Sequence, residues 1–104
     1  MSRYELFDRN SLRLRSLDER GHDLHWSDCL VLKVPDRPFE HPEFTEFLAR
    51  AVDARRSDRP VILMMGAHPI KLGLSRYIVD LIERGGVTHL AVNGAAIIHD
   101  FELA

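Results

Sequence analysis

Residues 60–104 read PVILMMGAHPIKLGLSRYIVDLIERGGVTHLAVNGAAIIHDFELA, and the pattern of apolar and small residues in this stretch decides the fold. The run at 61–65 is short, continuously apolar and bounded by Pro60 and Gly66, which is typical of a strand buried on both faces of a parallel sheet. A helical pattern over 74–84 and a second apolar run over 89–92 follow. This order predicts a βαβ unit in which the two strands are parallel neighbours.

Turns rich in small residues follow both predicted strands, at 66–73 and at 93–96. Ligands of parallel α/β folds bind outside the carboxyl ends of the strands, so we expect the two turns to lie side by side at a functional edge. In the first turn, glycine allows close approach of a ligand and Lys71 offers a charge for a phosphate. The spacing matches neither the dinucleotide fingerprint nor the P-loop. An ordinary turn with a solvated lysine is the alternative.

The second turn leads into two polar residues that we expect on the first turn of a helix. His99 can act as an acid or base, and Asp100 can accept hydrogen bonds from a ligand. The alternative for Asp100 is a structural role, because the helix dipole stabilises a negative charge in the first turn. Asn-Gly is also common in tight turns for backbone reasons alone. The candidate binding residues are Gly66, Ala67, His68, Lys71, Gly73, Asn93, Gly94, Ala95, His99 and Asp100.

Three helices are predicted. A helix that starts near Pro42 carries an apolar stripe expected to dock on the core, formed by Phe44, Phe47, Leu48, Ala51 and Val52. The helix at 74–84 is expected to be capped by Gly73 or Ser75 and to end at the glycine pair 85–86. A last helix is expected to begin near Ala95 or Ala96 and to be cut off at the end of the sequence.

The chain divides into an arm at 1–28 and one partial domain at 29–104. The segment 26–34 is expected to form a short strand or an apolar clip. With 104 residues, a formal charge of -2 and charges of both signs interspersed, nothing favours nucleic acid or a membrane as partner. The single Cys29 is interpreted as a small core residue in a cytoplasmic protein. The cluster around His22 and His25 is interpreted as chance rather than a metal site.

With these motifs in view, the stretch 60–104 resembles the amino-terminal nucleotide-binding part of the deoxyhypusine synthase-like family, and most closely its bacterial members of unassigned function. The resemblance implies a Rossmann-like sheet, NAD at the subunit interfaces of a tetramer, and transfer of an aminobutyl group from a polyamine. The synthases have Thr-Ser-Asn where this chain has residues 66–68, and Thr-Ala-Gly-Gly where it has 93–96. Of their Glu-Glu-Asp, only Asp100 is retained. Their catalytic lysine corresponds to a position beyond Ala104.

The sequence therefore predicts an α/β protein with a three-layer Rossmann-like parallel sheet that looks truncated. Its expected function is to bind NAD as the amino-terminal portion of a deoxyhypusine synthase-like enzyme with a polyamine or small amine substrate. The alternative is a non-catalytic binding or assembly module that retains the fold. A partial sheet leaves apolar surface and a strand edge uncovered, so a homo-oligomer or a complementary chain is expected.

Overall fold

A computed structural model describes residues 3–4 and 6–103, so that positions 1, 2 and 5 of the predicted arm and position 104 of the predicted domain lie outside the description. Three short 3-10 helices occupy the amino-terminal part: Arg9–Ser11, Leu17–Glu19 and Trp26–Asp28. The remaining elements are α1 (Pro42–Arg56), β1 (Ile62–Met65), α2 (His68–Lys71), α3 (Ser75–Glu83), β2 (His89–Val92) and α4 (Gly94–Leu103).

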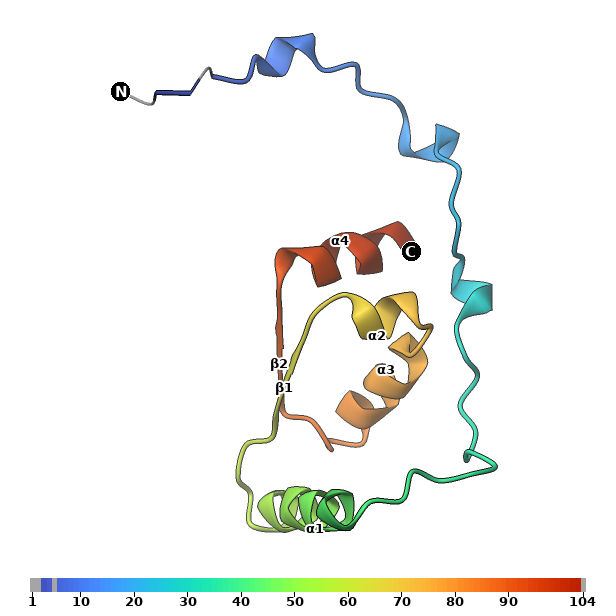
Figure 1. Ribbon diagram of the computed structural model, residues 1–104, viewed down its shortest axis with the longest axis vertical. Coiled ribbons are helices and arrows are strands. Elements are labelled where there is room, and N and C mark those ends of the chain that lie inside the picture. Colours follow the sequence, from blue (N-terminus) through green and yellow to red (C-terminus); the bar gives the residue numbers. More distant parts are fainter. Residues whose placement is uncertain (1–2, 5, 104) are drawn as a thin grey trace.

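The two strands form a parallel sheet, as the sequence predicts. Ile62 pairs with His89 and Met65 pairs with Val92, with α2 and α3 in the connection between the strands (Figure 1). The face that carries Met65, Leu90 and Val92 is covered by α3 and the start of α4, and a cavity of about 250 Å³ remains between them. The chain is thus an α/β protein whose small core lies on one side of a two-stranded sheet.

The prediction that the strands are buried on both faces is wrong. On β1, Ile62 is 58% exposed and Met64 is 79% exposed, and all four residues of β2 are exposed. The helices that cover the sheet lie on the opposite face, with α2 and α3 to one side of the strands in Figure 1. The continuous apolar run shows that these side chains could be buried, but the described elements leave every residue of β2 exposed and cover alternate residues of β1 only in part.

Helix α1 begins at Pro42 as predicted, but its apolar stripe is not docked on the core. No residue of α1 is buried, and Phe47 is 61% exposed. The helix lies beside the amino-terminal ends of the strands rather than over a sheet face (Figure 1). Arg55 of α1 approaches the loop after α3, since its guanidinium lies 3.0 Å from the place where a Cβ on Gly85 would stand.

The first loop contains a helix that the sequence analysis did not expect. α2 starts directly at His68, and Pro69 is tolerated because the first turn of a helix needs no amide donor there. Gly73, with a φ of +75°, ends this turn. Helix α3 then begins at Ser75, and its cap is Leu74, not Gly73 or Ser75 as predicted. Its end agrees with prediction, since Gly85 has a φ of +67°.

Helix α4 begins at Gly94, slightly before the predicted start. The predicted turn at 93–96 is therefore the cap and first turn of α4, and His99 lies beyond the first helical turn. The buried apolar residues of the described chain are Cys29, Ile70, Val87 and Ala96. Cys29 is thus a small core residue, as predicted. None of the helices in residues 3–4 and 6–103 is long and apolar enough to span a membrane.

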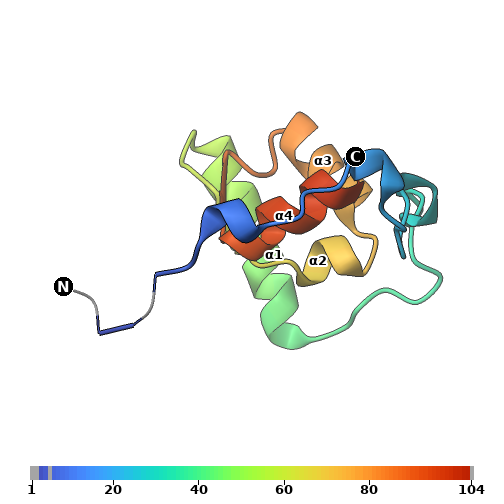
Figure 2. The same ribbon diagram turned by 90° about the horizontal axis from the view of Figure 1, so that it is seen from above.

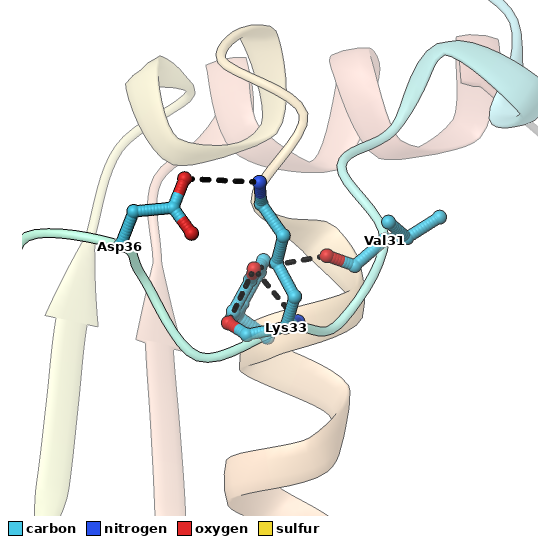
Figure 3. A network of polar contacts seen from close by, with 4 residues as sticks. Val31, Lys33 and Asp36 are labelled. Atoms are coloured by element: carbon cyan, nitrogen blue, oxygen red, sulfur yellow. Dashed lines mark hydrogen bonds and ion pairs between the residues drawn. The ribbon is translucent and has the colours of Figure 1, made fainter.

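Residues 20–33, which we call the strap, run along one side of the molecule, beside α2, α3 and the carboxyl end of α4 (Figures 1 and 2). The Leu30 amide donates to the Gly73 carbonyl at 2.9 Å. The Tyr77 hydroxyl of α3 donates to the Val31 carbonyl at 2.9 Å and accepts from the Lys33 amide at 3.2 Å (Figure 3). Residues 26–34 therefore form the apolar clip and not the strand. Their backbone hydrogen bonds join them to the loop at Gly73 and to the Tyr77 side chain, not to the edge of the sheet.

Candidate functional site

The carboxyl ends of β1 and β2 bring the two predicted turns together. A Cβ on Gly66 would lie 3.4 Å from Asn93 Nδ2, so the asparagine side chain lies beside the glycine. A shallow groove of about 420 Å³ runs along this end of the sheet, lined by Met64, Met65, Gly66, Ala91, Val92 and Asn93. The expected juxtaposition of the two turns is confirmed, and it rests on the parallel register of the strands.

The start of α4 opens onto the same end of the sheet. Asn93 Oδ1 accepts from the Ala96 amide at 3.1 Å, which caps the helix. Within the described chain, the amides of Gly94 and Ala95 donate no hydrogen bond, and a Cβ on Gly94 would meet nothing within 4 Å. Free amides, the positive end of the helix dipole and open space above a glycine form a suitable place for an anionic group.

The other predicted residues of the first turn do not line the groove at the strand ends. Ala67 caps α2 and accepts from the Lys71 amide, while His68 is the exposed first residue of that helix. Gly73 faces the strap, since a Cβ there would lie 3.3 Å from both Cys29 Cα and Leu30 N. The close backbone approach that we expected from a ligand at Gly73 is thus made by the chain itself.

Lys71 and His99 lie together in a second place, a cleft of about 380 Å³ at the far end of α4 from Asn93. The strap closes this cleft with Arg20, His22 and Asp23, and α4 adds Glu102. Asp100 is separate from both, at the edge of the apolar cavity between α3, α4 and the sheet. The ten predicted residues are therefore distributed over two ends of α4 rather than gathered at one site.

Sequence reasoning missed Arg20 and Glu102 and dismissed His22. Arg20 donates a hydrogen bond to Glu102 across 82 residues of sequence, and His99 Nδ1 lies 3.7 Å from the other oxygen of that carboxylate. The hydrogen bond from Arg20 lowers the pKa of Glu102 below its ordinary 4.5, burial opposes this shift, and the charges of Arg20, His99 and His22 add to it. No local sequence motif predicts a contact between residues so far apart in the chain.

This lowered pKa makes the attachment of the strap sensitive to acid. A carboxyl group with a depressed pKa in the folded state contributes stability above its unfolded pKa and loses it as the pH falls through the folded value. We expect the free energy of unfolding of the wild type to fall below about pH 4.5, with a smaller fall in Glu102→Gln. Urea titrations from pH 7 to pH 3 measure both slopes. Glu83→Gln, at an exposed position, is the control, and equal slopes for all three proteins would contradict the prediction.

Within the described residues, no group of three histidine, cysteine, aspartate or glutamate side chains is arranged to hold a metal ion. No family model, curated protein or solved structure matches this chain. The functional assignment therefore depends on the strand-end geometry and on the motifs at 60–104.

Proposed function

We propose that this chain binds NAD at the carboxyl ends of β1 and β2, as the nucleotide-binding portion of a deoxyhypusine synthase-like enzyme. In this proposal the two strands belong to a three-layer Rossmann-like sheet, and Gly66, Asn93, Gly94 and Ala95 face the cofactor. A polyamine or small amine is the proposed substrate class.

One observation supports the proposal most directly: the Asn93 side chain lies beside Gly66 at the end of a parallel strand pair, below the open amino terminus of α4. Parallel α/β proteins bind nucleotides at this position, with phosphate on helix amides. The groove beside it has a volume of about 420 Å³ and is open along the sheet. It would take one part of a dinucleotide, and a neighbouring subunit would supply the remaining contacts.

The decisive experiment places a side chain where the phosphate would lie. A Cβ on Gly94 meets nothing within 4 Å, so Gly94→Val should fold normally while it blocks close approach to the helix amides. We expect isothermal titration calorimetry to show saturable NAD binding to the wild type and an affinity at least about tenfold lower for Gly94→Val.

Gly21→Val is the matched control, because the same substitution there also meets nothing within 4 Å. Its affinity for NAD should equal that of the wild type. Absence of NAD binding by the folded wild-type protein, or equal affinities for all three proteins, would refute the proposal.

A second function, an assembly module without catalysis, is favoured by the amount of apolar surface. Phe101 and Ile97 of α4 and Met64 of β1 are all largely exposed. Surfaces of this kind mark protein-protein contacts.

We expect the purified chain to associate. Multi-angle light scattering should give a mass of at least twice 12.0 kDa, because exposed α4 and sheet side chains gain free energy when they are buried. A monodisperse, cooperatively melting monomer of 12.0 kDa would contradict this prediction. NAD titration of the same sample separates the two functions, since assembly alone requires no cofactor.

A further inference from the structure

The cleft beneath the strap contains charges of both signs that belong to three different segments. Arg20 and Asp23 come from the strap, Lys71 from the end of α2, and Glu102 from the last turn of α4. With neutral histidines, two cations and two carboxylates give the lining a formal charge of zero. A ligand of high net charge of either sign would therefore gain little from this cleft as a whole.

The four charges are not equivalent. Arg20 and Glu102 form an ion pair with each other, and the hydrogen bond from Arg20 lowers the pKa of Glu102. In the described part of the chain, Lys71 and Asp23 have neither an ion-pair partner nor a side-chain hydrogen bond. The cleft thus offers one free ammonium group and one free carboxylate.

Part of the remaining lining is apolar. Leu24, Ile70 and Leu103 supply apolar side chains, His22 and His99 supply polar ones, and Ile70 is buried where α2 meets α4. A volume of about 380 Å³ lies at the lower end of the range for small-molecule sites, about 300–1,000 Å³. An apolar portion beside a small number of polar groups is typical of such sites.

We propose that this cleft binds a small zwitterion with an apolar stem, such as a free amino acid with an aliphatic side chain. Lys71 binds the ligand carboxylate, Asp23 binds the ligand ammonium group, and the aliphatic stem lies against Ile70 and its apolar neighbours. The inference does not depend on NAD binding, because Asn93 and Glu102 are at opposite ends of α4.

Three probes of similar shape isolate the two charges. L-Leucine carries both, 4-methylpentanoate lacks the ammonium group, and 3-methylbutylamine lacks the carboxylate. We expect chemical shifts of the amides around Ile70 and Leu103 to titrate with L-leucine in a ¹H–¹⁵N correlation experiment. Each single-charge probe should bind about fivefold more weakly, as expected for the loss of one partly exposed ion pair.

Charge-removing variants assign each contact to one residue. Lys71→Gln should weaken L-leucine and 4-methylpentanoate by about fivefold and leave 3-methylbutylamine unchanged, whereas Asp23→Asn should weaken L-leucine and 3-methylbutylamine by about fivefold and leave 4-methylpentanoate unchanged. Lys33→Gln and Asp36→Asn are the matched controls, since this exposed ion pair (Figure 3) is not part of the cleft lining. Equal binding of the three probes, no saturable shift with L-leucine, or equal effects of cleft and control variants would overturn the proposal.

Discussion

Gly73→Val is expected to lower the free energy of unfolding by about 2–4 kcal/mol. Gly73 has a φ of +75°, a conformation that a β-branched residue adopts only with strain. The added Cβ would also stand 3.3 Å from the backbone at Cys29 and Leu30, where the strap is fastened by the Leu30 amide. Backbone cannot rotate out of the way as a side chain can, so both costs apply together.

Urea denaturation followed by circular dichroism measures this change. Gly21→Val is the control, because Gly21 has open space around it and should change stability by less than about 0.5 kcal/mol. If Gly73→Val were as stable as Gly21→Val, the strap would not be held against the α2–α3 connection as described.

Ile70→Ala is expected to lower the free energy of unfolding by about 2–3 kcal/mol. Ile70 is 5% exposed and borders three cavities, of which two lie under the strap and one lies between α3, α4 and the sheet. Removal of its side chain would join these spaces, and the surrounding segments cannot all move inward at once.

Leu72→Ala offers a control in the same connection. Leu72 is 61% exposed, and its truncation should cost less than about 0.5 kcal/mol. Urea denaturation again measures the change, as a shift of the midpoint concentration while the dependence of the unfolding free energy on urea stays the same. Equal losses for the two variants would show that Ile70 is not the centre of this core.

Local residue chemistry was sufficient to predict the main elements. Both strands, the parallel order and the helices that start at Pro42 and near Ser75 follow from apolar periodicity, proline and glycine. Asn93 and Gly66 were predicted at adjacent turns because parallel strands end at one sheet edge. These signals come from residues close together in the chain, and a short stretch of backbone with such residues has few favourable conformations.

Burial was predicted less well than secondary structure. The stripe of α1 with Phe47, and the β1 face with Met64, have the composition of a core, yet both remain exposed. Apolar composition states that burial would be favourable, while burial itself requires a second surface at the right place. That surface depends on how elements distant in sequence are arranged.

The sequence by itself determined the βαβ order of this chain and the meeting of its two small-residue turns, since these follow from short-range backbone preferences and the rules of parallel sheets. Only the tertiary structure decided that Lys71 and His99 lie apart from Asn93, in a cleft closed by Arg20 of the strap. A contact between Arg20 and Glu102 spans 82 positions and depends on the path of the whole chain, which no local pattern encodes.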